Sequence, residues 1–210
     1  MLQNTIYTKV LIAAFLLIIG AILAGIGTLI RDWYILKKEK LSTAYAFKGE
    51  IETILKIIEK RQYIKLFSKD IEIKKTELNE LNRQNIDDIS VPLKKEKILK
   101  LLRSLTFRVN RDVFFVKNIL KNKIGLLEKT AENIVLFYGY CNAFLLDIKD
   151  SEENNKLNKK LIQSGYSPND INSVIEDSIR RDKEILKIAE EIIKSGDESI
   201  KELNKFISKL

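Results

Sequence analysis

The sequence predicts an all-α protein in which one N-terminal transmembrane helix is followed by a cytoplasmic helical bundle. Three observations predict this fold class. An uncharged apolar segment of 21 residues lies near the start of the chain, apolar residues elsewhere recur at helical spacing, and the 210 residues include only two prolines, Pro92 and Pro168. Proline interrupts helices, so its scarcity leaves room for long ones. We therefore expect one membrane span and one soluble core.

The composition excludes several classes of enzyme. The single cysteine, Cys141, cannot form an intrachain disulfide, and histidine is absent. Without histidine there is no Ser-His-Asp or Cys-His nucleophile system, and most zinc sites are excluded as well. The sequence carries no cofactor motif, so we expect neither a cofactor nor a bound metal.

The transmembrane helix is predicted from residues 10–30, VLIAAFLLIIGAILAGIGTLI, which contain no charged residue. At about 1.5 Å per residue this segment covers the roughly 30 Å of a hydrocarbon layer. A cleaved signal peptide has a shorter apolar region and a small-residue cleavage site, whereas Arg31 and Asp32 follow directly here. Residues 1–36 are therefore predicted to be a retained anchor in the lipid bilayer.

The flanking charges predict the orientation of the span. Lys9 stands alone before it, and a group of cations follows it: Arg31, Lys37, Lys38, Lys40 and Lys48. Loops rich in lysine and arginine stay in the cytoplasm. We therefore expect the inner (plasma) membrane of a cell, with the N-terminus outside and the C-terminal domain cytoplasmic.

Small residues gather on one face of the predicted span, where another helix can approach closely. They are Gly20, Ala21, Ala24, Gly25 and Thr28. This face favours self-association, and a homo-oligomer is expected. The alternative is that the face reflects only the general abundance of glycine and alanine in membrane helices.

Residues 37–85 are predicted to form an amphipathic juxtamembrane helix, because they contain no proline and keep helical spacing. Its apolar stripe comprises Ala46, Ile51, Ile54, Leu55, Ile58, Leu66 and Phe67. This stripe packs either in the protein's own core or against the same helix of another subunit. The polar segment 77–91 before Pro92 predicts a boundary, and residues 86–210 are expected to form the cytoplasmic helical domain.

Residues 93–111, LKKEKILKLLRSLTFRVNR, form the most basic stretch of the chain. Its candidate anion-binding residues are Lys97, Lys100, Arg103, Arg108 and Arg111. Such a strip suits lipid headgroups, an anionic ligand or nucleic acid. Nucleic acid is the least favoured of these because no nucleic-acid fold motif accompanies the strip, and a solvated helix face explains it as well.

Residues 110–149 predict a helical hairpin at the centre of the core. Asn110 caps the first helix, and Gly125 is expected to end it in a left-handed conformation. The second helix starts at Glu128 or Thr130 and carries the apolar residues Ile134, Val135, Phe137, Tyr138, Cys141, Leu145 and Leu146. The aromatic residues here are interpreted as core rather than as a stacking platform.

The helix AFKGEIETILKIIEKRQY and the later KIGLL…IVLFY hairpin follow the single span. This arrangement resembles a group of uncharacterized bacterial single-pass membrane proteins with a helical cytoplasmic domain, over residues 10–148. The resemblance implies that architecture only, and it brings no activity or site residue.

The C-terminal part begins with the polar run SEENNKLNKK, interpreted as a loop or an exposed helix extension. Ser167-Pro168 then predicts a helix start, because proline is favoured in the first turn. This helix is expected to reach Gly196, followed by a final short helix. Residues 31–149 carry 25 basic and 16 acidic residues, and residues 150–210 carry 11 and 13, so the two parts differ in sign.

These patterns favour a non-enzymatic, membrane-anchored assembly or interaction protein, either bound to a protein partner or acting as an oligomeric membrane effector or pore. The alternative is an anchored sensor that binds an anionic ligand, lipid or nucleic acid through the basic strip. An enzyme would have to rely on the acid pairs Asp87–Asp88 or Glu152–Glu153, which lack a metal-ligand pattern.

Overall fold

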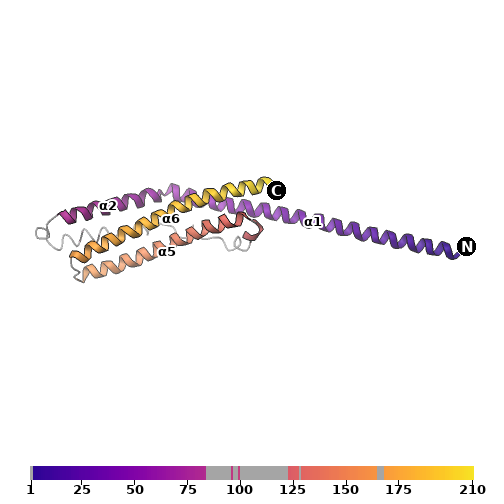
Figure 1. Ribbon diagram of the computed structural model, residues 1–210, viewed down its shortest axis with the longest axis horizontal. Helices are drawn as coiled ribbons and strands as arrows, with labels where there is room; N and C mark the ends of the chain where they lie inside the picture. Colours follow the sequence, from indigo (N-terminus) through magenta and orange to yellow (C-terminus); the bar gives the residue numbers. More distant parts are fainter. Residues whose placement is uncertain (1, 84–95, 97–98, 100–122, 128, 165–167) are drawn as a thin grey trace.

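The computed structural model describes residues 2–83, 96, 99, 123–127, 129–164 and 168–210, and every element within these ranges is helical (Figure 1). The elements are α1 (Leu2–Lys60), α2 (Tyr63–Arg83), the single 3₁₀ turn η3 (Ile124–Leu127), α5 (Thr130–Gln163) and α6 (Pro168–Lys209). The predicted all-α class is confirmed, with one long apolar helix at the N-terminal end.

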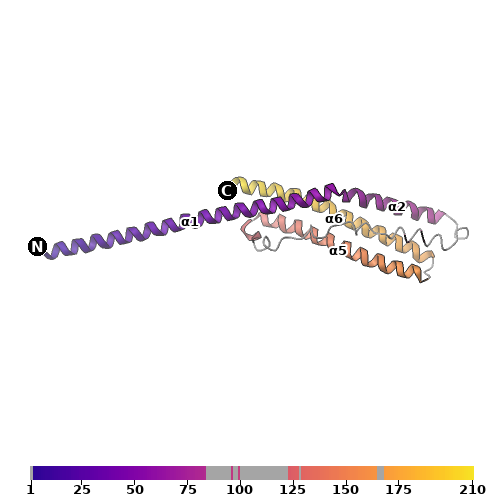
Figure 2. The same ribbon diagram turned by 180° about the vertical axis from the view of Figure 1, so that it is seen from behind.

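The described residues form a bundle of three helical layers. α1 and α2 follow one another along its length, α6 runs beside both, and α5 pairs with α6 (Figures 1 and 2). Two side-chain hydrogen bonds define the direction of α6: Lys48 Nζ donates to Asn204 Oδ1 at 2.8 Å, and Asn172 Nδ2 donates to Asn82 Oδ1 at 2.8 Å. α6 is therefore antiparallel to α1 and α2, and the N-terminal half of α1 projects alone from one end.

Buried residues follow a repeat of three and four along each helix. On α1 they are Ala44, Phe47, Ile51, Ile54 and Ile58. On α5 they are Ile134, Phe137, Cys141, Phe144 and Ile148, and on α6 they are Ile185, Ala189, Ile192, Ser199 and Leu203. A repeat of this kind keeps one face of a helix turned toward its neighbours in a nearly parallel bundle. The amphipathic stripe of α1 thus packs within the chain's own core.

The helix predicted for residues 37–85 is divided at Arg61 and Gln62. The Gln62 amide donates to the Glu59 carbonyl at 2.9 Å, and Gln62 has a φ of 51°. A left-handed residue other than glycine or asparagine is uncommon, and it ends the regular ladder of α1. The chain resumes as α2 on the same side of α6, so the break changes direction without leaving the bundle.

The break predicted at Gly196 is wrong, because α6 runs through this residue to Lys209. Gly196 is buried, and a Cβ built there would lie 2.8 Å from Leu55 Cδ2 and 3.0 Å from Phe137 Cε2. The missing side chain therefore lets α6 approach α1 and α5 closely. Glycine here serves packing rather than helix termination.

Four smaller expectations also change. Gly125 lies inside η3 without a left-handed φ, so it does not end a helix that way. Val135 and Leu146 are exposed, because they fall outside the repeat that carries Ile134 and Leu145 into the core. Ala46 is exposed for the same reason, beside buried Phe47.

Helix starts were predicted more accurately. α5 begins at Thr130 and α6 begins at Pro168. The run SEENNKLNKK continues α5 as a helix, although Ser151 and Asn155 within it are buried rather than exposed. The first helix of the predicted hairpin, starting at Asn110, lies outside the described residues.

The close approach at Gly196 can be tested against Gly139, where no atom lies within 4 Å of the position that a Cβ would occupy. Gly196→Leu should lower the free energy of unfolding by about 1–3 kcal/mol, because the new side chain overpacks the contact with Leu55 and Phe137. Gly139→Leu should raise it by roughly 0.5–1 kcal/mol through helix propensity. Urea unfolding in detergent, followed by helical circular dichroism, measures both. Equal effects at the two positions would contradict the packing role of Gly196.

Candidate functional site

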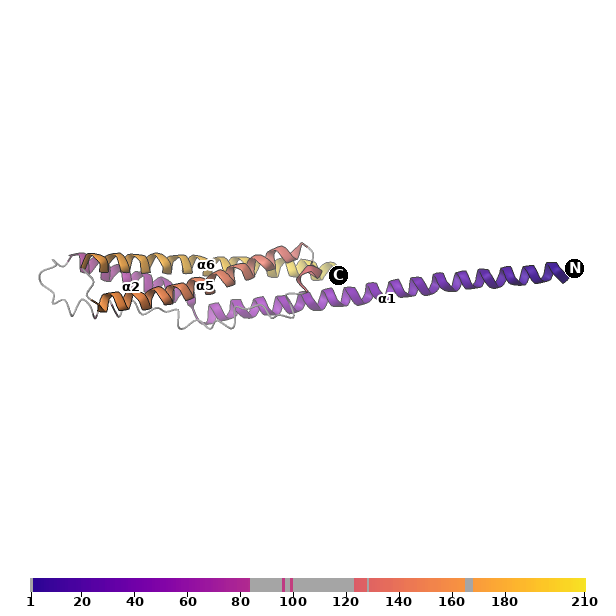
Figure 3. The same ribbon diagram turned by 90° about the horizontal axis from the view of Figure 1, so that it is seen from below.

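The apolar part of α1 is the most distinctive surface of the molecule. Figure 3 shows this part of α1 extending alone beyond the bundle. Its large apolar side chains are exposed from Ile12 to Leu36, and the most apolar stretch has no buried residue. Among the described residues, this is the one helix long and apolar enough to cross a membrane. In water this surface would be strongly unfavourable, at about 25 cal/mol per Å² of apolar area.

The five small residues predicted to pack in the membrane all lie on this exposed part of α1. Gly20 and Gly25 have no atom within 4 Å of a Cβ position, so the chain itself leaves this face open. The Thr28 hydroxyl donates to the Ala24 carbonyl at 2.9 Å. That bond satisfies the only side-chain polar group of the face within its own helix, as a hydrocarbon environment requires.

Polar groups begin directly after the apolar residues 10–30. Arg31 pairs with Asp32 at 3.3 Å, and Lys37 Nζ lies 5.2 Å from the centre of the Trp33 ring. Trp33 and Tyr34 are 61% and 63% exposed on the same stretch. Exposed aromatic rings followed by cations are typical of the membrane–water interface. Burial in the bundle begins only at Thr43 and Ala44.

A second feature lies inside the bundle, between α2 and α6. The Lys74 ammonium is 1% exposed and donates to the carboxylate of Asp182, which is 2% exposed. It also pairs with Asp70 at 2.9 Å and donates to Ser178 Oγ at 3.2 Å. Burial raises the pKa of the Asp182 carboxyl above its ordinary value, and the adjacent Lys74 ammonium opposes that rise.

This buried charge cluster extends toward α5. Ser199 Oγ donates to the Asn133 carbonyl at 3.0 Å, and the antiparallel register that this bond defines brings Ser151 level with Arg181. Polar atoms of Ser151, Asn155 and Arg181 are buried and have no hydrogen-bond partner among the described residues.

Sequence reasoning missed the Lys74 cluster, although a signal was present. Lys74 continues the buried spacing of Phe67, Ile71 and Leu78 on α2, and Asp182 lies between Ile179 and Ile185 on α6. A charged residue at an interior position of such a repeat needs a buried partner. The arrangement holds α2 in register with α6. Lys74 is buried and paired with two acids, so its amine is not available to react with a ligand.

The aromatic residues of α5 form core, as predicted. Phe137 and Tyr138 lie 5.1 Å apart between ring centres, and Tyr138 contacts Phe47 of α1 at 6.3 Å. Cys141 is fully buried beside them. Burial, with a smaller contribution from the charge of Glu50, raises the pKa of Cys141 to about 12, so the thiol is inert at neutral pH.

The predicted anion-binding residues Lys97, Lys100, Arg103, Arg108 and Arg111 lie outside the described residues, as do Asp87 and Asp88. Of the other acid pair, Glu153 is exposed and lies 3.9 Å from Lys149. The parts of the chain that the structure covers contain no group of three potential metal ligands.

Comparison with known proteins adds no identification: no protein-family model, no curated protein and no solved structure matches this chain.

Breaking the buried cluster should be costly. Lys74→Met leaves the Asp182 carboxylate buried without its cation, and should lower the free energy of unfolding by about 3–5 kcal/mol. Lys74→Met combined with Asp182→Leu removes both charges and should restore most of that loss. Chemical denaturation of the unmodified protein, the single variant and the double variant measures the effect.

Arg180→Ala provides the control for the Lys74 variants. It removes an exposed ion pair with Asp177 at 3.0 Å, and should change the stability by less than about 1 kcal/mol. A loss in Lys74→Met no larger than the loss in Arg180→Ala would contradict the role of the cluster in holding α2 on α6.

Proposed function

We propose that this chain is a single-pass membrane protein of non-enzymatic function, anchored in the inner (plasma) membrane and presenting its helical bundle to the cytoplasm as an assembly or interaction module. The observation that carries the proposal is the apolar surface of α1. It is fully exposed, it is continuous with the bundle through one unbroken helix, and the chain has no other described element that covers it.

The proposed orientation rests on the cations after the span. Lys37, Lys38 and Lys40 follow the exposed aromatic residues Trp33 and Tyr34 on α1. Retention of basic flanks in the cytoplasm then places the bundle on that side. The bundle's closed core, with a buried inert thiol, suits a module that binds through its surface rather than one that performs chemistry.

We further propose that the span self-associates through its small-residue face, which includes Gly20, Ala24 and Thr28. This face is open in the single chain, and Thr28 makes its hydrogen bond within its own helix, so close approach of a second helix leaves no polar group unsatisfied. An oligomer of this kind would carry several bundles side by side. A pore is a special case that requires further subunits around a central axis.

Membrane insertion is tested by alkaline extraction and by proteolysis of spheroplasts. The protein should stay in the membrane pellet, and its bundle should be cleaved only after permeabilisation. Leu17→Arg with Leu23→Arg should release it, because each arginine in the middle of a span costs about 2.5–3.5 kcal/mol. Extraction of the unmodified protein by alkali would refute the anchor. Cleavage of the bundle in intact spheroplasts would show that the bundle faces the outside instead.

Self-association is tested by cross-linking and light scattering in detergent at matched concentrations. Ala24→Leu should weaken association about tenfold or more, since a larger side chain prevents close approach of the helices. Ile26→Phe adds bulk on the opposite face of the span and should leave association unchanged. A monomeric unmodified protein, or equal effects of the two variants, would remove the oligomer from the proposal.

A further inference from the structure

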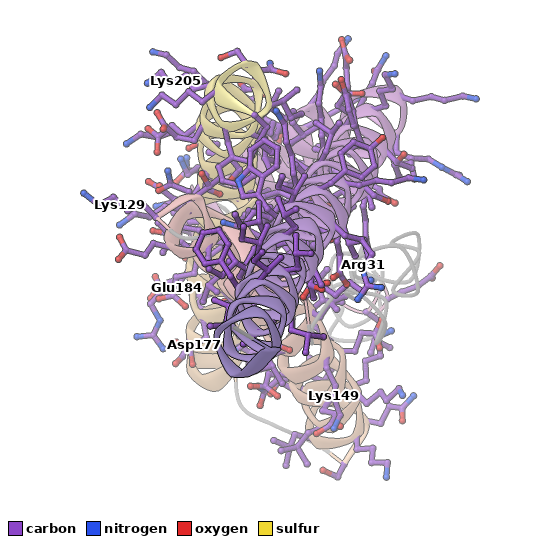
Figure 4. All side chains as sticks on the ribbon, turned by 90° about the vertical axis from the view of Figure 1, so that its right-hand side faces the viewer. Arg31, Lys129, Lys149, Asp177, Glu184 and Lys205 are labelled. Carbon is purple, nitrogen blue, oxygen red and sulfur yellow. The ribbon has the colours of Figure 1, made fainter. Side chains whose placement is uncertain are left out.

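Lysines gather at the end of the bundle from which the anchor emerges. We name this surface the basic rim and define it by Lys37, Lys38, Lys40, Lys129, Lys201, Lys205 and Lys209. It comes from three elements that are far apart in sequence: α1, the start of α5 and the last turns of α6. Figure 4 looks along α1 from its N-terminal side and shows Lys205 and Lys129 on the same side of the bundle.

The described contacts place the rim near the end of the apolar surface. Asn204 of α6 is level with Lys48 of α1, since their side chains are hydrogen-bonded at 2.8 Å. Each helix rises about 1.5 Å per residue, so Lys209 comes level with roughly residue 43 of α1, Lys205 with roughly residue 47 and Lys201 with roughly residue 51. Lys123 binds Glu39 at 3.0 Å and holds the turn before α5 at the same height.

The distance to the bilayer differs among the rim lysines. Exposed apolar side chains continue to Leu36, and beyond it the level of Lys209 lies about 10 Å away, that of Lys205 about 16 Å and that of Lys201 about 22 Å. Headgroups occupy roughly 5–8 Å outside the hydrocarbon. Lys37, Lys38, Lys40 and Lys209 therefore lie nearest to the headgroups, and Lys205 lies about one Debye length of 8–10 Å from them.

The charge at this end is one-sided. In the described segments 37–42, 123–127, 129–132 and 201–210 there are eight lysines, the rim residues and Lys123, against the acids Glu39, Glu132 and Glu202. Two of these acids are paired, Glu39 with Lys123 and Glu202 with Lys205 at 2.6 Å. Near the other end, the described segments 75–80, 152–163 and 176–184 carry seven basic and eight acidic residues. Among these described segments, the excess of positive charge is at the anchored end.

We propose that the basic rim binds the anionic lipid headgroups of the leaflet from which α1 emerges, and so docks the bundle upright on the membrane. This inference rests on the proposed membrane anchor. Each lysine near the surface increases binding to an anionic leaflet about fivefold. Because Lys37, Lys38, Lys40 and Lys209 lie nearest to where α1 leaves the bilayer, lipid headgroups are the anionic groups closest to the rim.

The test measures the distance between the rim and the headgroups in the full chain. Ser208→Cys places a nitroxide at the rim, and Ser164→Cys places one at the remote end of α5; both serines are exposed. Buried Cys141 stays unlabelled. The proteins are placed in nanodiscs of phosphatidylcholine, with or without phosphatidylglycerol, that contain a trace of nickel-chelating lipid. Spin relaxation by the headgroup nickel then reports proximity.

We expect relaxation at position 208 to rise with phosphatidylglycerol and to return toward the phosphatidylcholine value in high salt, while position 164 stays unaffected. Lys205→Glu with Lys209→Glu should weaken docking by more than about tenfold. Lys205→Gln with Lys209→Gln should act in the same direction without adding acids beside Glu202. Lys156→Glu with Lys160→Glu, an equal charge change at the remote end, should have no effect.

The outcomes separate the two proposals. A protein that does not co-elute with nanodiscs refutes the anchor itself. A protein that enters nanodiscs but shows the same relaxation at position 208 in both lipids refutes only the rim's recognition of anionic lipid. The same refutation follows if the rim pair and the remote pair of substitutions have equal effects.

Discussion

The backbone hydrogen bonds of α1 continue without interruption from an apolar segment into the core of a bundle, and this continuity places every other described element relative to the apolar segment. α6 packs antiparallel on α1, and α5 pairs with α6. The end of the bundle near the anchor is therefore built from three distant parts of the chain.

The core of this bundle has two unlike halves. Near the anchor it is apolar and closely packed, with Phe47, Phe137 and Gly196 at the meeting of three helices. Farther away, beyond the break at Gln62, it contains the Lys74–Asp182 pair and buried polar atoms of α5. A buried ion pair specifies register at a cost in stability, whereas apolar packing supplies stability.

Residue patterns were sufficient where the physical signal is local. The apolar run, the start of α6 at Pro168 and the burial of Cys141 all follow from the composition of a few turns. Residue patterns gave wrong predictions where the packing of a neighbouring helix decides the role of a residue. Gly196 was expected to end a helix, and Val135 and Leu146 were expected in the core, because sequence spacing shows neither which helix approaches nor from which side.

The amino-acid sequence by itself determined that this protein is helical and carries one segment apolar enough to span a membrane, since both properties depend on the chemistry of neighbouring residues. Only the tertiary structure decided that Lys74 meets Asp182, and that the last turns of α6 lie beside Lys48 of α1. Contacts between residues a hundred or more positions apart depend on the register of packed helices. That register is set by the summed fit of side chains along the bundle, which no single stretch of sequence contains.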